Sequence, residues 1–199
     1  FGTMLELPIV QSVWWPRFER SIRWYVDWER KRRLDIERVE PEIIGSLSFE
    51  APGGPFKLSA KADRLDVKPG GRVAIVDYKT GQSPSMDQIR RGFSPQMTLE
   101  AAIALAGGFP GITAENVDEL VYVKLTGAEE GGKAVLVNFK DEVLEDVVHE
   151  SLARFKTFVA SFDNPDQPYL SKPHVLFLDS PGDYDHLARV KEWSSGGGE

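Results

Sequence analysis

Asp77 and Lys79 carry opposite charges two residues apart, directly after the apolar stretch Val73–Val76. The Val and Ile side chains of that stretch predict a buried strand. Since side chains alternate between the two faces of a strand, we expect Asp77 and Lys79 on one face and Tyr78 on the other. A carboxylate beside an ammonium at the exit of a buried strand indicates either a functional site or a simple surface ion pair, and the spacing is compatible with both.

Asp63 lies on the preceding predicted strand and is the nearest candidate for a second acid at this point. A three-residue turn over Pro69–Gly71 would bring Asp63 opposite Asp77. A two-residue turn would instead bring it opposite Tyr78, whose side chain lies on the other face. The sequence leaves both registers open.

Two aspartates that face each other repel unless a cation lies between them or one of them is protonated. Mg²⁺ prefers carboxylates, a carbonyl and water as ligands, and a lysine beside it can position a water molecule or help to lower its pKa. This set of groups predicts phosphodiester hydrolysis. The competing interpretation is that Asp63 and Asp66 pair with Arg64 and Lys68 on a solvated face. Asp66 stands at odd spacing from Asp63 and is expected to face away from the site.

The elements that must hold these residues follow from the hydrophobic pattern, which predicts a helix, three strands, a helix, two strands and a helix. Together they predict an α/β fold with a mixed central sheet of about five strands flanked by helices. The expected ranges are helix 12–34, strands 36–50, 56–67 and 73–78, helix 96–106, strands 120–125 and 133–139, and a last helix with Asp141 and Glu142 at its start.

Two local features refine these elements. In the first helix, the apolar stripe expected to pack inward consists of Trp14, Phe18, Ile22, Tyr25 and Val26. Residues 81–92 are expected to form a polar loop, and the helix after it is expected to start with Ser94 as its N-cap and Pro95 in its first turn.

Composition limits the possible function classes. The absence of cysteine excludes disulfides, thiolate zinc sites and cysteine-bound iron–sulfur clusters within the chain, and it fits a cytoplasmic location. We find no membrane span and no signal peptide. The net charge of −7 argues against a generic nucleic-acid binder, so any phosphate contact should be local, metal-assisted or supplied by another part of the protein.

The length fits a single domain over residues 1–193, followed by a flexible tail over residues 194–199. Because the first residue is Phe1, we expect the chain to be part of a longer protein, truncated at its N-terminus.

Three segments resemble the signature of PD-(D/E)xK nucleases of the RecB type: Ala60–Asp66 (AKADRLD), Asp77–Gly81 (DYKTG) and Gln96–Glu100 (QMTLE). The family pattern is G-x-x-D-R-x-D, then D-Y-K-T-G, then Q-x-x-x-Y on a following helix. The helix over residues 95–103 and the segment Gly182–Arg189 more specifically resemble the C-terminal nuclease domain of AddB, a subunit of the AddAB helicase–nuclease that processes broken DNA ends. The resemblance covers most of the chain and implies a restriction-endonuclease-like core.

Carried over residue by residue, the resemblance implies that Asp63, Asp77 and the backbone carbonyl of Tyr78 bind Mg²⁺ or Mn²⁺. It implies that Lys79 is the catalytic lysine, and that Gln96 orients Lys79 or a phosphate. Beyond the residues with these implied roles, Lys61, Arg90 and Arg91 are candidate DNA contacts, although a solvated strand face or loop explains them equally well.

The sequence departs from the family pattern at three points. Ala60 replaces a glycine, and Glu100 replaces the aromatic residue of the last motif. Family members also carry a His or Glu on an early helix that completes the metal site. Glu19 is the only mid-helix candidate here, and we expect that it lies on a solvated helix face and that the missing residue lies upstream. Some AddB proteins hold an iron–sulfur cluster through four cysteines, which this chain lacks.

The sequence thus predicts a metal-dependent DNA nuclease domain that acts in the end processing of DNA double-strand breaks. The expected partners are a single-stranded DNA end delivered by a helicase and an AddA-like helicase–nuclease subunit. The alternative is a non-catalytic module that keeps the fold and binds DNA or docks the partner subunit. The departures favour this alternative, whereas the paired acids disfavour it.

Overall fold

In a computed structural model of the chain, the structure describes residues 7–140 and 142–168. Three features expected from the sequence lie outside these ranges: Asp141 at the start of the last helix, the segment Gly182–Arg189, and the tail over residues 194–199. Everything below concerns the described residues.

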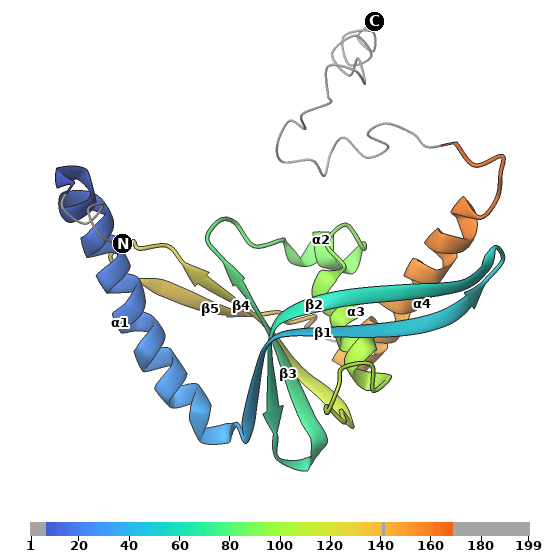
Figure 1. Cartoon of the computed structure of the whole chain (residues 1–199), viewed down its shortest axis with the longest axis horizontal. Helices are drawn as coiled ribbons and strands as arrows, with labels where there is room; N and C mark the ends of the chain where they lie inside the picture. The colour runs from blue at the N-terminus through green and yellow to red at the C-terminus, as the bar shows by residue number, and fades with distance from the viewer. Residues whose placement is uncertain (1–6, 141, 169–199) are drawn as a thin grey trace, which may run out of the picture.

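A five-stranded sheet in the order β1-β2-β3-β4-β5 forms the centre of the molecule (Figure 1). Neighbouring strands are antiparallel except β3 and β4, which are parallel. The predicted mixed sheet flanked by helices is therefore confirmed. The strands are β1 (Arg38–Ala51), β2 (Gly54–Lys68), β3 (Arg72–Lys79), β4 (Asn116–Leu125) and β5 (Gly132–Leu136).

The crossover between the parallel strands carries two helices, α2 (Met86–Arg90) and α3 (Gln96–Leu105). The sequence predicted only a polar loop where α2 lies. A capping box was missed there, because Ser85 and Gln88 each bond the backbone N–H of the other. Helix α3 begins at Gln96, as expected, but Pro95 is its N-cap and no side chain caps it, so the expectation of a Ser94 cap is wrong.

The two faces of the sheet are covered by different helices. Helices α3 and α4 (Leu144–Phe162) cover the face that carries Leu65, Ile75 and Leu120, and these residues form the main core. Helix α1 (Trp15–Arg32) packs on the opposite face through Trp24, Tyr25 and Trp28, against a smaller cluster of Val76, Val121 and Val123. Alternation of side chains along β3 and β4 thus separates two apolar layers.

The apolar stripe expected on the inner face of the first helix is mostly wrong. Trp14, Phe18, Ile22 and Val26 are 63%, 53%, 41% and 38% exposed, and only Tyr25 of that stripe packs on the sheet. The reason lies in the β4–β5 turn. A Cβ on Gly131 would come within 2.3 Å of the Arg20 carbonyl oxygen, and one on Gly132 within 2.4 Å of the Trp24 ring.

These two glycines let α1 approach the turn closely on the side that carries Trp24. The close approach selects the stripe of Trp24, Tyr25 and Trp28 for burial instead of the stripe read from the sequence.

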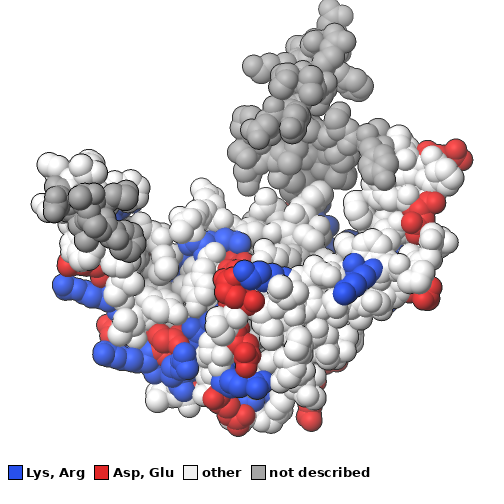
Figure 2. All heavy atoms as spheres, in the orientation of Figure 1, with Lys and Arg blue, Asp and Glu red and all other residues white. Residues whose placement is uncertain are grey.

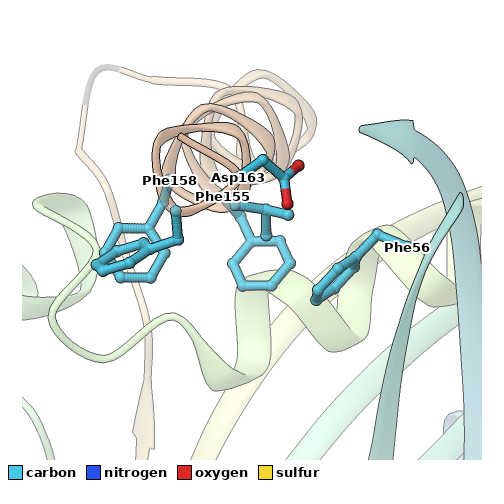
Figure 3. Close-up of a pocket in the computed structure, with 6 residues that line it drawn as sticks. Phe56, Phe155, Phe158 and Asp163 are labelled. Atoms are coloured by element: carbon cyan, nitrogen blue, oxygen red, sulfur yellow. The ribbon is translucent and has the colours of Figure 1, made fainter. Parts of the chain in front are cut away.

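A cavity of about 500 Å³ at the tip of the β1–β2 hairpin is lined by four phenylalanines, Val159 and Asp163 (Figure 3). Among its lining residues, Phe56 lies seven positions before Asp63 on β2, roughly 23 Å along the strand. The cavity is therefore separate from the candidate site.

None of the helices in the described ranges has the length and apolar character needed to cross a membrane.

Candidate active site

Asp77 and Lys79 lie at the exit of β3, in the middle of the sheet. The Asp77 side chain is only 2% exposed, and the Lys79 ammonium lies 2.7 Å from its Oδ2 atom with 30% of the lysine side chain exposed. The pair is thus a nearly buried carboxylate beside a partly open ammonium, which is not the geometry of a simple surface pair. The ammonium also lies 6.0 Å from the centre of the Tyr122 ring, which forms part of the floor beneath it.

Asp63 approaches this pair from β2. The strands pair with Lys68 opposite Arg72 and Leu65 opposite Ile75, so the register is that of the three-residue turn. The ladder ends at Arg64 and Val76, one position before the two aspartates. Beyond that point, Asp63 accepts a hydrogen bond at Oδ2 from the backbone N–H of Tyr78, at 3.0 Å.

Gln96 joins the site from the first turn of α3. Its amide nitrogen donates to Asp77 Oδ1 at 3.0 Å and to Glu100 Oε1 at 3.2 Å. The amide therefore orients Asp77, whereas the resemblance implied an action on Lys79 or on a phosphate. Glu100 lies one helical turn further along α3 and is only 2% exposed.

Glu100 is a site residue that the sequence reading missed, because it was treated only as a departure from the family pattern. The available signal was its spacing of four residues from Gln96, which puts both side chains on one face of a helix.

Burial and crowding of the acids dominate the electrostatics of the site. Burial raises the pKa of Glu100 to about 7; the hydrogen bond from Gln96 opposes this rise, and the charges of Asp77 and Asp63 add to it. Burial also raises the pKa of Asp77, against the opposing effect of Lys79. The pKa of Tyr122 rises to about 12, through burial first and then through Asp77 and Glu100. The site therefore concentrates negative charge in a place with little water.

The donor set fits a hard divalent cation. Asp77 Oδ2 is buried, and among the described residues it has an ion pair with the Lys79 ammonium at 2.7 Å but no hydrogen-bond partner. Asp63 and the Tyr78 carbonyl would add oxygen ligands of the kind that Mg²⁺ prefers. In residues 7–140 and 142–168, no three His, Asp or Glu side chains are arranged to hold a metal ion. The candidate oxygen donors are the carboxylates of Asp63 and Asp77 and the Tyr78 carbonyl, and the Glu100 carboxylate shares the donor Gln96 with Asp77.

The three candidate DNA contacts all have carboxylate partners. Arg90 pairs with Glu142 at 2.5 Å and with Glu150 at 2.8 Å. Arg91 pairs with Asp87 at 3.0 Å, and Lys61 pairs with Glu42 across the β1–β2 hairpin. On the face shown in Figure 2, basic and acidic side chains are interleaved. DNA contact by these three residues remains a prediction.

Two other acids considered in the sequence lie outside the site. Glu19 accepts a hydrogen bond from Trp15 and pairs with Arg23 on the exposed side of α1. Asp66 faces away from Asp63, as expected, but it is fully buried rather than solvated, and it bonds Arg32 and Arg64. The alternative of a solvated face for Arg64, Asp66 and Lys68 is therefore wrong.

Curated relatives match the chain over part of its length. A Rickettsia bellii protein named "Uncharacterized protein" is 26% identical over 149 residues, which is 68% of this chain and 18% of the relative. A Rickettsia felis protein of the same name is 28% identical over 109 residues, which is 55% of this chain and 13% of the relative. The chain thus spans less than a fifth of the length of these relatives.

Solved structures with a similar arrangement include one named "Putative exonuclease" from Eubacterium rectale. It is 16% identical, with a TM-score of 0.41, over 86% of this chain and 65% of that one. Another, named "SSO0001", is 15% identical with a TM-score of 0.37, over 79% of this chain and 68% of that one.

The model of one protein family matches most of the chain. That family is described as the PD-(D/E)XK nuclease superfamily, and its model covers residues 5–173. The mixed five-stranded sheet flanked by helices agrees with the restriction-endonuclease-like fold of that family. With the fold and the matched residues in agreement, the chain belongs to the PD-(D/E)XK nuclease superfamily.

Proposed function

We propose that the chain is a metal-dependent DNA nuclease domain that hydrolyses phosphodiester bonds. The observation that carries this proposal is the convergence on Asp77: Lys79 lies 2.7 Å from one oxygen, and Gln96 donates to the other at 3.0 Å. Asp63 reaches the same strand end through the Tyr78 N–H. A fold without catalytic function gains no stability from crowding buried acids in this way.

Each residue has a role in this proposal. Asp63, Asp77 and the Tyr78 carbonyl hold Mg²⁺ or Mn²⁺, and Gln96 keeps the Asp77 carboxylate in one orientation. A bound divalent cation would compensate the charge of the scissile phosphate and acidify a water molecule. Lys79 stabilises the negative charge that develops on the phosphate oxygens, because its ammonium is partly exposed and lies in a site with little water.

The proposed context is a larger helicase–nuclease of the AddAB type that processes DNA double-strand breaks in the cytoplasm. Support comes from the resemblance of the helix over residues 95–103 and of the segment Gly182–Arg189 to AddB, and from relatives several times longer than this chain. A helicase partner would deliver a single-stranded DNA end to the site. Delivery suits a chain with a net charge of −7, which attracts free DNA poorly.

The test is a cleavage assay on the full-length protein with end-labelled single-stranded DNA and Mg²⁺ or Mn²⁺. We expect Asp77→Ala and Lys79→Ala to lower the rate by roughly a hundredfold or more. Lys133→Ala is the matched control, because it removes the same charge from an exposed position on β5 and should cleave like the wild type. Equal degradation by wild type and both site variants would refute the proposal.

The alternative of a non-catalytic module is favoured by one observation. In the described part of α1, Glu19 is held by Trp15 and Arg23, so it does not complete the metal site. The same assay separates the two functions. Binding of single-stranded DNA by the wild type without any cleavage, in either metal, would support the module.

A further inference from the structure

Tyr78 lies between Asp77 and Lys79, and it is held from both faces of the sheet by two consecutive residues of β2. Asp63 accepts a hydrogen bond from its backbone N–H at 3.0 Å, and Arg64 donates to its hydroxyl at 3.3 Å. We propose that Arg64 is a positioning residue that acts through the Tyr78 side chain to fix the strand end carrying the metal ligands. This inference rests on the metal site of the proposed function.

The end of β3 needs such support on its β2 side. Backbone pairing between β2 and β3 stops at Arg64 and Val76, before the three residues that form the site. On the other side, pairing with β4 continues to Lys79 and Lys124. The strand end is therefore fixed along one edge by backbone bonds, and along the other edge by the side chains of Asp63 and Arg64.

Arg64 is itself held rigidly enough to act as a support. It is 3% exposed, and it donates from Nε to Asp66 at 2.6 Å and from Nη1 to Glu29 at 2.6 Å. Its guanidinium lies 5.5 Å from the centre of the Trp28 ring. These contacts come from β2 and α1, so Arg64 connects the strand end to the helix on the far face. The planar, forked guanidinium makes this possible, and a lysine cannot reproduce it.

Tyr25 completes the contact on the far face. Its hydroxyl lies 3.1 Å from the Tyr78 hydroxyl and 3.4 Å from Arg64 Nη1. The Tyr78 hydroxyl therefore has two partners, Arg64 from β2 and Tyr25 from α1. Groups that orient metal ligands typically change metal affinity by 10- to 100-fold when they are removed.

The test measures Mn²⁺ binding to the full-length protein without DNA, from the electron paramagnetic resonance signal of free Mn²⁺. Arg32 provides the matched control, because it also bonds Asp66, at 2.5 Å, but its other partner is Glu119 rather than Tyr78. We expect Arg64→Lys to weaken Mn²⁺ binding roughly tenfold and Arg32→Lys to leave it within about twofold. Tyr78→Phe removes only the hydroxyl and should also weaken binding roughly tenfold.

The cleavage assay adds a second readout. Excess Mn²⁺ should restore the rate of Tyr78→Phe, because the variant loses metal affinity and keeps Asp77 and Lys79. Equal loss of Mn²⁺ affinity in Arg64→Lys and Arg32→Lys would overturn the inference, because a general disruption of the buried ion-pair network would then explain both losses. Wild-type affinity in Tyr78→Phe would overturn it as well, and this variant decides the question if Arg64→Lys does not fold. Failure of the wild type to bind Mn²⁺ would refute the metal site, and the proposed function with it.

Discussion

The buried acid Glu100 should make the stability of the metal-free protein depend on pH. Its pKa lies at about 7 in the folded chain, against an ordinary value of 4.5, mainly because of burial and the nearby charges of Asp77 and Asp63. The folded state therefore binds a proton between these pH values that the unfolded state has released. It follows that this group's contribution to stability is fully present below pH 4.5 and is lost as the pH rises to about 7.

The size of the effect follows from the pKa change. At about 1.4 kcal/mol for each tenfold change in proton affinity, a rise in pKa from 4.5 to about 7 corresponds to about 3–4 kcal/mol. In a domain of this size, that is roughly 7–14 °C in melting temperature. Glu100→Gln removes the titrating group and keeps the side-chain shape, so the variant should lack this part of the pH dependence.

The assay is thermal or urea unfolding in EDTA at pH 5 and pH 8.5, for the wild type and Glu100→Gln. Any packing difference between wild type and Glu100→Gln is the same at both pH values. The change with pH in the difference between their unfolding free energies therefore reports only the titration of Glu100. Between pH 5 and pH 8.5, we expect the unfolding free energy of Glu100→Gln to rise by about 2–3 kcal/mol relative to that of the wild type. Glu129→Gln, at an exposed position after β4, serves as the control and should show no such gain. Parallel pH profiles for wild type and Glu100→Gln would refute the reasoning.

Three further predictions concern other parts of the molecule. Gln96→Leu should lower the cleavage rate roughly 10- to 100-fold, because the carboxylates of Asp77 and Glu100 lose their amide donor. Single-turnover kinetics at saturating Mg²⁺ would measure this loss, and an unchanged rate would contradict the role of Gln96 in orienting Asp77. Lys61→Ala should change the unfolding free energy by under about 1 kcal/mol. If this lysine contacts DNA, the same variant should bind single-stranded DNA with a weaker salt dependence. The slope of log binding constant against log salt concentration should fall in magnitude by about one. Gly45→Ala should destabilise the protein by about 1–3 kcal/mol in urea unfolding, because a Cβ there would lie 2.4 Å from the Phe109 ring. Gly81→Ala is the control and should be neutral, because a Cβ at that position meets nothing within 4 Å.

The order of the main elements and the identity of the central acid–lysine pair could be predicted from local signals. Strand β3 is a short apolar run between a glycine turn and a polar loop, so its exit at Asp77 and Lys79 was evident from alternation alone. Helix α2 was missed because its five residues lie in a polar segment without apolar periodicity. Its capping box at Ser85 and Gln88 was the signal that remained.

The register of the β2–β3 hairpin was open in the sequence and was settled by turn geometry. Gly70 and Gly71 have φ angles of 74° and 68°, which other residues rarely adopt. This conformation makes the three-residue turn and fixes Lys68 opposite Arg72. Asp63 consequently reaches the same strand end as Asp77.

By itself, the sequence determined the order of the main strands and helices and the place of the acid–lysine pair at the end of β3, because hydrophobic period and turn residues act locally. Only the tertiary structure decided how those residues are surrounded. The close approach of α1 to the β4–β5 turn selected Trp24 and Trp28 for burial, against the stripe that the sequence indicated. Packing of α3 on the sheet buried Glu100 beside Gln96, and packing of α1 enclosed Arg64 beneath Tyr78. These features depend on contacts between distant segments, and burial then sets the charge and rigidity of the groups involved.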